Sequence, residues 1–194
     1  MRVRYGNLQT AMIRKGYQFF DDGDYNLNLI GIRTADNQSN FFNDHFAVAW
    51  RFDGVPHCLV FPATTDPGIF WRQNPMHIRG TAILVPGQYQ RLWQLGMHRG
   101  QYHALVQLRP ARVYRDNNRD SIIDIDAPID DGLFGINCHR ASGTHGSQRV
   151  DKWSAGCQVL ANPFDFALLI ALCDRAARAW GTTFTYTLLE EADL

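Results

Sequence analysis

A cysteine and a histidine in the second half of the chain are the pair best suited to chemistry. Cys157 follows the run Ser154-Ala155-Gly156, and His139 lies upstream of that run. A thiolate is a strong nucleophile, an imidazole can take or share its proton, and small flanking residues leave space for a substrate. The backbone N–H groups of Gly156 and Cys157 can face a developing oxyanion. We therefore predict a thioester mechanism in which protonated His139 lowers the pKa of the Cys157 thiol.

The sequence around this pair resembles the catalytic domain of the L,D-transpeptidases, which are cysteine enzymes of peptidoglycan. That family carries a histidine, a spacer, and then Ser/Thr-His-Gly-Cys, and here a spacer of similar length separates His139 from the run Ser154 to Cys157. The resemblance covers about residues 133–172. It departs from the family at Ala155, which replaces the motif's histidine, and at Val159, where many members have a polar residue.

The resemblance implies a mainly β (α+β) fold, an L,D-transpeptidase-like β-sandwich with an N-terminal helix and a C-terminal helix after the strand of the catalytic cysteine. It also implies that the backbone carbonyl of Arg140 orients the histidine. The implied substrate is a peptidoglycan stem peptide, attacked at an L,D amide bond. Water as acceptor would make the enzyme an L,D-carboxypeptidase or endopeptidase, and an amine would make it an L,D-transpeptidase.

Three further residues flank the catalytic pair, and we expect them to contact the substrate. Arg140 follows the histidine directly, while Trp153 and Ser154 precede the cysteine. Loops and strand ends carry functional residues disproportionately, which favours this interpretation. Packing or simple solvation would also account for such residues.

An alternative to an enzyme is a non-catalytic, β-rich structural or cell-wall-binding module that retains the fold. The departures at Ala155 and Val159 favour this alternative. The presence of both His139 and Cys157 favours the enzyme, because a retired site has no evident reason to keep both residues.

A zinc site is a rival use of the same region. It would combine four residues, namely Cys138, His139, His145 and Cys157. Cys138 and His139 are adjacent and would point to opposite faces of a strand, and the spacings match no common zinc motif. We therefore favour the nucleophile, with Cys138 facing the core.

A run of acidic and amide residues has the spacing of a calcium loop. Its candidate ligands at positions 1, 3, 5, 7 and 9 are Asp116, Asn118, Asp120, Ile122 (through its carbonyl) and Asp124. Position 6 is Ser121 where the motif has glycine, and position 12 is Ala127 where it has glutamate. The sequence leaves open a structural Ca²⁺ site or a metal-free Asn/Asp turn. The predicted chemistry itself requires no cofactor.

Composition indicates one globular domain. The chain has 194 residues and 45% hydrophobic content, which suffices for one sizeable core. We expect a single catalytic domain over 1–194, with a helical extension over 1–25 and the L,D-transpeptidase-like core over 26–194. The formal net charge is +0, so no electrostatic signature for nucleic acid is present. No apolar run has the length of a membrane span.

The expected location follows from the cysteines and the N-terminus. The four cysteines have no disulfide-framework spacing, and the first residues lack the apolar core of a signal peptide. We expect a protein made in the cytoplasm with reduced thiols. Because the resembled family acts on the cell wall, we expect it to reach peptidoglycan after release or delivery, as a phage lysis protein, an injected effector or a particle component would.

Hydrophobic periodicity and turn residues predict the elements that position the pair. A helical stripe covers 8–20, and Asp53-Gly54 joins two strands of a hairpin. A second helix begins at Pro163 after an Asn162 cap and ends at Gly181. The expected strands are 26–33, 46–52, 55–61, 81–85, 102–107, 112–114, 133–137 and 182–189.

Overall fold

The computed structural model describes residues 3–36 and 40–194, so Met1 and Arg2 of the expected helical extension lie outside the described residues. Eight strands form a closed barrel. In order around the barrel they are β1 (Asn28–Arg33), β11 (Thr183–Glu190), β5 (Gly87–His98), β6 (Tyr102–Gln107), β9 (Cys138–Arg140), β10 (Gln158–Leu160), β3 (Val55–Thr64) and β2 (Asp44–Phe52).

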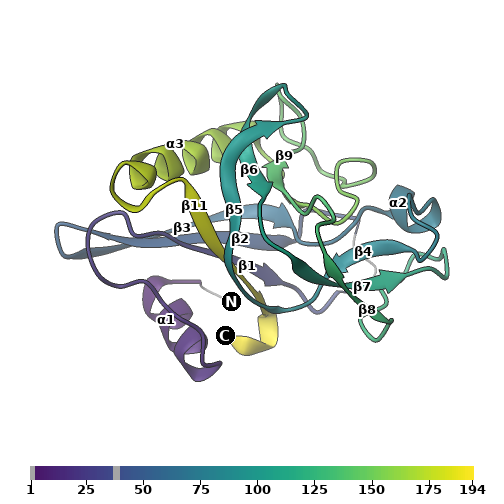
Figure 1. The fold of residues 1–194 in the computed structure, drawn as a ribbon, viewed down its shortest axis with the longest axis horizontal. Coiled ribbons are helices and arrows are strands. Elements are labelled where there is room, and N and C mark those ends of the chain that lie inside the picture. The colour runs from purple at the N-terminus through teal and green to yellow at the C-terminus, as the bar shows by residue number, and fades with distance from the viewer. Residues whose placement is uncertain (1–2, 37–39) are drawn as a thin grey trace.

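A smaller sheet and three α-helices complete the described fold. The sheet has the order β4 (Thr81–Leu84), β7 (Ala111–Asp116) and β8 (Ile129–Gly132). The helices are α1 (Tyr5–Arg14), α2 (Ile69–Gln73) and α3 (Pro163–Trp180), and a 3₁₀ turn spans Glu191–Asp193. Figure 1 shows the small sheet and α2 together at the right end of the molecule, with α3 above the barrel strands.

The expectation of a mainly β protein with a few helices is confirmed. Strand pairing closes the main sheet into a barrel, whereas the sequence analysis expects a two-layer sandwich. The closure comes from long-range pairs that no local pattern encodes. In particular, β1 pairs in parallel with β11 near the C-terminus, with Leu29 opposite Tyr186.

The predicted hairpin is confirmed as β2 and β3, which pair antiparallel from Phe52–Val55 outward. Asp53 and Gly54 have φ values of 49° and 71°, the left-handed pair that a two-residue hairpin turn requires. Both strands are longer than predicted: β2 begins at Asp44, which pairs with Ala63, and β3 continues to Thr64, which pairs with Val159 of β10.

The predicted first helix is shorter than expected. It ends at Arg14, whereas the periodicity extends to residue 20. The chain leaves the helix at Gly16, which has a φ of 73° and whose N–H donates to the Ile13 carbonyl. A left-handed glycine of this kind stops a helix whatever apolar residues follow it.

The last helix, α3, agrees with its prediction at both ends. The Asn162 side chain accepts a hydrogen bond from the Phe164 N–H at 2.9 Å, and Gly181 follows the last turn with a φ of 84°. The buried face of α3 carries Cys173, which lies in the main core together with Cys138 of β9. Both cysteines are therefore packing residues, as expected.

The expected strand over 133–137 is wrong. β8 ends before this segment, β9 begins after it, and Gly135 has a φ of 76°. The Gln107 side chain accepts hydrogen bonds from the N–H groups of Phe134 and Ile136, at 3.0 and 2.8 Å. A side chain from β6 thus replaces the strand neighbour that this segment lacks. Strand β5, the longest in the barrel, was not among the predicted strands.

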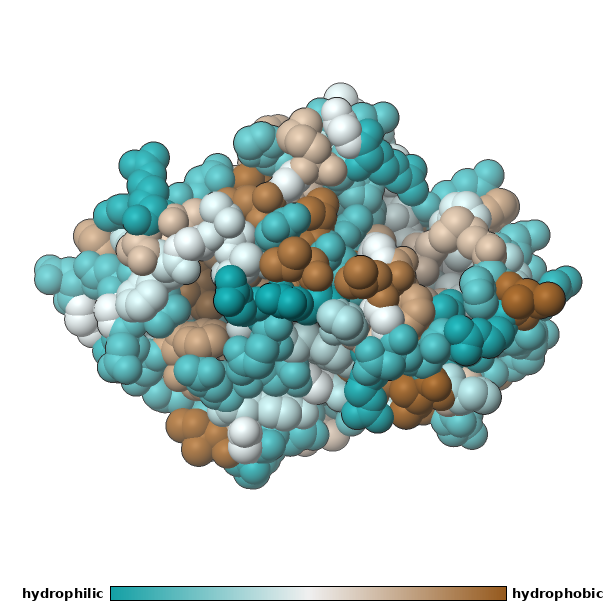
Figure 2. All heavy atoms as spheres, in the orientation of Figure 1, coloured by the Kyte–Doolittle hydropathy of each residue, from teal (hydrophilic) through white to brown (hydrophobic). Residues whose placement is uncertain are grey.

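Two hydrophobic clusters support the barrel. The main cluster contains the aromatic residues Phe46, Trp93 and Tyr186, and the buried face of α3 packs against it. The second lies under α1, with Leu8 and Met12 against Ile30 and Ala47. Figure 2 shows hydrophilic residues over most of one face of the molecule, with hydrophobic residues in separate patches.

Candidate functional site

Parallel pairing of the short strands β9 and β10 brings the two predicted catalytic residues together. Val159 lies opposite His139, and the Gln158 N–H donates to the Asn137 carbonyl at 2.9 Å. Cys157 precedes β10 and has the same side-chain parity as Val159. We therefore place Cys157 and His139 on one face of this strand pair, while Cys138 occupies the core on the other face.

The His139 ring is held by the backbone of the next residue. Its Nδ1 lies 2.8 Å from the carbonyl oxygen of Arg140. Because a carbonyl can only accept, Nδ1 carries the proton and Nε2 is left as an acceptor. This hydrogen bond lies at the place that the family resemblance implies. His139 is 5% exposed, so few rotations are open to its ring.

The Cys157 thiol is half-buried and points toward the backbone that leads into β9. Its sulfur donates to the Gly135 carbonyl at 3.2 Å. Within the described residues, the hydrogen bonds of the thiol do not include the His139 ring. In the resting state the thiol proton therefore stays on Sγ and points at the Gly135 carbonyl oxygen.

The electrostatics differ from the thiolate–imidazolium pair that the sequence predicts. Burial lowers the pKa of His139 to about 4, against the smaller raising effect of the Arg140 carbonyl. Burial also raises the pKa of Cys157, partly offset by the Asn137 backbone and the charge of Arg99. Both groups are therefore neutral near pH 7. These pKa directions do not favour a thiolate–imidazolium pair in the resting protein, because both groups are withdrawn from water.

A buried serine fixes the turn that presents the nucleophile. The Ser154 hydroxyl donates to the Cys157 carbonyl at 2.8 Å and accepts from the Gly156 N–H at 3.1 Å. Ser154 is 0% exposed, so it lies beneath the turn and not at a surface that a substrate reaches. The expected substrate contact of Ser154 is therefore replaced by a positioning role.

The same turn limits the predicted oxyanion donors. Gly156 has a φ of 119°, and a side chain there would come within 2.3 Å of the Ala82 carbonyl. Its N–H is already engaged by Ser154. Within residues 3–36 and 40–194, no protein acceptor takes the Cys157 N–H. Cys157 is thus the donor that can reach an oxyanion, and Gly156 supplies the turn.

His98 is a site residue that the sequence analysis missed. It comes from the end of β5, and its ring stacks on His139 with centroids 4.3 Å apart. Its Nδ1 lies 3.4 Å from the Asn137 side-chain nitrogen. Burial lowers the pKa of His98, so the ring adds little positive charge beside His139. No spacing in the sequence could reveal the role of His98, because β5 pairs with β6 and β6 with β9, and these pairings bring His98 to His139.

One cavity is bordered by the His139 ring and by Trp153, and we call it the cationic cavity. It holds about 290 Å³ and is lined by His98, Arg99, Gln101, Tyr102, His139, Arg140, Ala141, Gly143, Lys152 and Trp153. The Arg140 guanidinium lies 4.2 Å from the centre of the Tyr102 ring. Two predicted substrate contacts, Arg140 and Trp153, therefore border the space beside the base.

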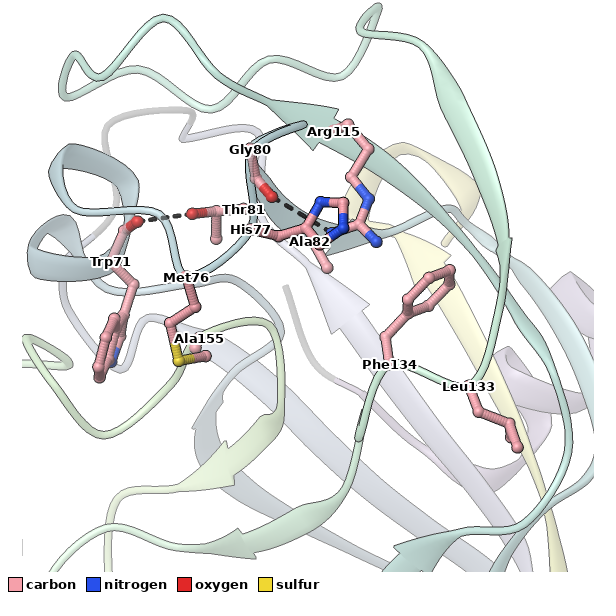
Figure 3. A pocket seen from close by; sticks show the side chains of 10 residues that line it. All are labelled: Trp71, Met76, His77, Gly80, Thr81, Ala82, Arg115, Leu133, Phe134 and Ala155. Atoms are coloured by element: carbon pink, nitrogen blue, oxygen red, sulfur yellow. Dashed lines mark hydrogen bonds between the residues drawn. The ribbon is translucent and has the colours of Figure 1, made fainter.

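A second cavity borders the nucleophile turn at Ala155, and we call it the apolar cavity. It holds about 260 Å³ and is lined by Trp71, Met76, His77, Gly80, Thr81, Ala82, Arg115, Leu133, Phe134 and Ala155. Figure 3 shows Trp71, Met76 and Ala155 gathered on one side, with Phe134 and Leu133 on the other. The residue that departs from the family motif thus faces this cavity.

The predicted metal positions form a self-bonded loop. The Asn118 amide donates to Asp124 at 2.9 Å, and the Ile122 N–H donates to Asp120 at 2.6 Å. Asp116 is buried with both carboxylate oxygens lacking hydrogen-bond partners, and burial raises its pKa to about 6. Besides Asp116, one oxygen each of Asp120 and Asp124 has no hydrogen-bond partner among the described residues, while Asn118 and the other oxygens of Asp120 and Asp124 are engaged within the loop.

For any metal, the loop 116–124 included, the described part of the chain lacks a ready cluster of ligands. It contains no group of three or more His, Cys, Asp or Glu side chains placed to hold a metal ion. Cys138 faces the core and His139 the site, which separates two ligands of the zinc alternative.

Comparison of the chain with protein-family models, with curated proteins and with solved structures finds no match. None of the helices in the described residues is long and apolar enough to cross a membrane. Function is therefore argued from the geometry of the site.

Proposed function

We propose that this protein is a cysteine acyltransferase that acts on peptidoglycan stem peptides at an L,D amide bond through a Cys157 thioester. The observation that carries the proposal is the His139 ring, held at Nδ1 by the Arg140 carbonyl at 2.8 Å and placed on the face of the half-buried thiol. A base with a fixed tautomer on the same face as a half-buried thiol is an arrangement suited to covalent acyl transfer.

The chemistry starts from a neutral pair. As Sγ attacks the amide carbonyl, the S–H bond breaks and the thiol proton, which is donated to the Gly135 carbonyl at rest, moves from Sγ to His139 Nε2. The C–S bond forms and the carbonyl oxygen becomes an oxyanion, which the Cys157 N–H faces. The imidazolium then gives its proton to the leaving amine as the C–N bond breaks, which yields a thioester. In hydrolysis or transfer, His139 takes a proton from the attacking water or amine as its oxygen or nitrogen bonds to the acyl carbon. The C–S bond then breaks and the imidazolium returns the proton to Sγ.

The surroundings of His139 support an acidic substrate. Arg99, Arg140 and Lys152 border the cationic cavity. Among the described residues, no carboxylate forms an ion pair with these three side chains. A substrate carboxylate would find unpaired cations there. The choice of peptidoglycan, of the L,D bond and of the L,D-transpeptidase fold family rests on the sequence resemblance, as does delivery to the wall after synthesis in the cytoplasm.

The test is product analysis of purified peptidoglycan fragments incubated with the protein. We expect shortened stem peptides if water is the acceptor and cross-linked ones if an amine is. Cys157→Ala should abolish both products, and His139→Gln should lower the rate by about 10² to 10⁴. Cys58→Ala, which removes a half-buried thiol elsewhere, is the matched control and should keep full activity. Activity that persists in Cys157→Ala would refute the mechanism.

The alternative of a non-catalytic wall-binding module has one observation in its favour. In the resting state the thiol donates to Gly135 and not to the histidine, and the pKa of Cys157 is raised. Binding of insoluble peptidoglycan that is unchanged in Cys157→Ala, with no products from any wall type, would favour the module.

Calcium binding by the loop 116–124 stays a prediction, and the unpartnered Asp116 carboxylate is its support. Thermal unfolding with and without CaCl₂ tests it. A calcium-dependent rise in Tm that Asp116→Asn removes would support the site. No rise in the unmodified protein would end this prediction.

A further inference from the structure

A third cavity is built without any residue of the candidate site, and we call it the Trp180 cleft. It holds about 530 Å³, which is within the roughly 300–1,000 Å³ of small-molecule sites. It is formed by the segment between α1 and β1, by strand β5, and by the junction of α3 with β11. It shares no lining residue with the cationic or the apolar cavity. A ligand in the cleft would therefore contact a different set of residues from the substrate of Cys157.

Trp180 presents a fixed aromatic surface at the cleft. It is the last residue of α3 and is 47% exposed. Its Nε1 donates to the Asp24 carbonyl at 2.9 Å. The ring lies so close to Gly23 that a Cβ added there would come within 2.6 Å of a ring carbon. An indole that is already held in place loses little conformational freedom when a ligand stacks on its exposed surface.

The cleft combines an apolar floor with a polar rim. The floor consists of the buried apolar residues Leu27, Ala176 and Phe184. Three amide side chains lie on the rim, those of Gln18, Asn26 and Gln90. In the described part of the chain, the side-chain amide of Gln18 forms no hydrogen bond, and the Asn26 amide forms one, to the Asp22 carbonyl at 3.2 Å. Unused donors and acceptors therefore surround an apolar floor.

A bulge in β5 places two of the rim side chains. The strand has three residues, 90–92, opposite the single residue Thr185 of β11. Within the bulge, Arg91 has a φ of 52°, a left-handed value that arginine adopts only at a cost in free energy. The Arg91 Nε donates to the Thr183 hydroxyl at 3.1 Å, and the Thr185 hydroxyl donates to the Gln90 amide oxygen at 3.1 Å. Bulges and strained residues are concentrated at functional sites, and this bulge lies at the cleft.

Hydroxyl groups match the mixture of donors and acceptors on the rim. A sugar hydroxyl both donates and accepts, as a side-chain amide does, whereas a phosphate only accepts and would face the amide oxygens. Arg91 is the one charged residue among those that line the cleft, and within residues 3–36 and 40–194 it forms no ion pair. An extended peptide would need an unpaired strand edge, and β5 and β11 each have a neighbour on both sides in the barrel. The cleft therefore fits a neutral ligand rich in hydroxyl groups.

We propose that the Trp180 cleft binds an oligosaccharide. The apolar C–H face of one pyranose ring lies on the Trp180 indole, and the sugar hydroxyls bond the amides of Gln18, Asn26 and Gln90. Arg91 donates to the sugar from the side of β5. The proposal goes beyond acyl transfer and uses none of its residues, so it holds or fails apart from the chemistry of Cys157.

Titration with neutral trisaccharides, followed by ¹H–¹⁵N NMR, tests the proposal. The probes are tri-N-acetylchitotriose, cellotriose and maltotriose, which carry no charge and no peptide. We expect at least one of them to shift the amide signals of Arg91 and Thr183, with a Kd of about 1 mM or tighter. The signals of Gly156 and Cys157 should stay in place.

Two variants, each with a matched control, connect binding to the cleft. Trp180→Ala should weaken it about tenfold or more, whereas Phe164→Ala, at a 77% exposed aromatic residue at the other end of α3, should leave the Kd unchanged. Arg91→Gly removes the guanidinium and suits the left-handed backbone, so the fold should be kept while the Kd rises about threefold or more. Arg119→Gly, with a φ of 63° and the same loss of charge, should have no effect on binding.

Four outcomes would overturn the proposal. They are no shift with any of the three sugars, shifts at Gly156 and Cys157 in place of the cleft, an unchanged Kd in Trp180→Ala, and cleft shifts with adenosine monophosphate but with none of the sugars. None of these results bears on the acyl transfer at Cys157, which the products from stem peptides test separately.

Discussion

Ser154→Ala is the perturbation whose cost can be worked most directly from the structure. The Ser154 hydroxyl, which is 0% exposed, bonds the Gly156 N–H at 3.1 Å and the Cys157 carbonyl at 2.8 Å. Alanine leaves both backbone groups without that partner. Each buried group left unsatisfied costs about 1–3 kcal/mol. Two such groups would cost about 2–6 kcal/mol, and because Cys157 is only half-buried we expect a total of about 2–4 kcal/mol.

Unfolding by urea measures this loss, and the slope with denaturant should not change. In thermal unfolding the same loss should lower Tm by about 5–15 °C for a chain of this size. Ser121→Ala is the control, because Ser121 is exposed and its hydroxyl bonds none of the described residues, so we expect a change within about 0.5 kcal/mol. A Ser154→Ala variant as stable as Ser121→Ala would refute the assignment of Ser154 as the residue that holds the turn.

Three further predictions follow from the same contacts. Gly156→Ala should destabilise the protein by about 3 kcal/mol or more, since φ is 119° and the new Cβ would lie 2.3 Å from the Ala82 carbonyl oxygen. Urea unfolding measures this loss. The control is Gly146→Ala, which has open space around the new Cβ and should leave the stability nearly unchanged. Burial lowers the pKa of His139 to about 4, so the stability that its neutral ring contributes is lost as the pH falls from about 6.5 to 4. In His139→Gln the free energy of unfolding should not fall in this way over that pH range. Equal pH–stability curves for variant and parent would contradict this prediction. Burial raises the pKa of Asp116 to about 6, so its charged form destabilises the fold as the pH rises from about 4 to 6. Asp116→Asn should therefore raise the free energy of unfolding by up to about 3 kcal/mol at pH 7 and leave it unchanged at pH 3. A lower free energy of unfolding at pH 7 would refute this.

Local sequence signals predict the elements that depend on local chemistry. The Asp53-Gly54 turn and the α3 caps at Asn162 and Gly181 are confirmed, because turn and cap preferences act over a few residues. The side-chain parity of Cys138 and His139 is also as predicted, since it follows from strand geometry alone.

What the sequence does not predict depends on long-range contacts. The stretch 133–137 has a strand-like composition, but the Gln107 side chain takes its N–H groups and Gly135 turns the chain. His98 reaches the site through the hairpin of β5 and β6, far from His139 in sequence. The pKa directions of Cys157 and His139 depend on how deeply each is buried, which a motif does not encode.

The central claim is that Cys157 carries an acyl group during turnover, and intact mass measures this most directly. The protein would be mixed with purified peptidoglycan fragments, quenched in acid within seconds and weighed, with Cys157→Ala and Cys58→Ala run in parallel. The account predicts an added mass equal to the acyl half of the stem peptide in the parent and in Cys58→Ala, and none in Cys157→Ala. An adduct that persists in Cys157→Ala, or the release of cleaved stem peptides by that variant, would contradict it.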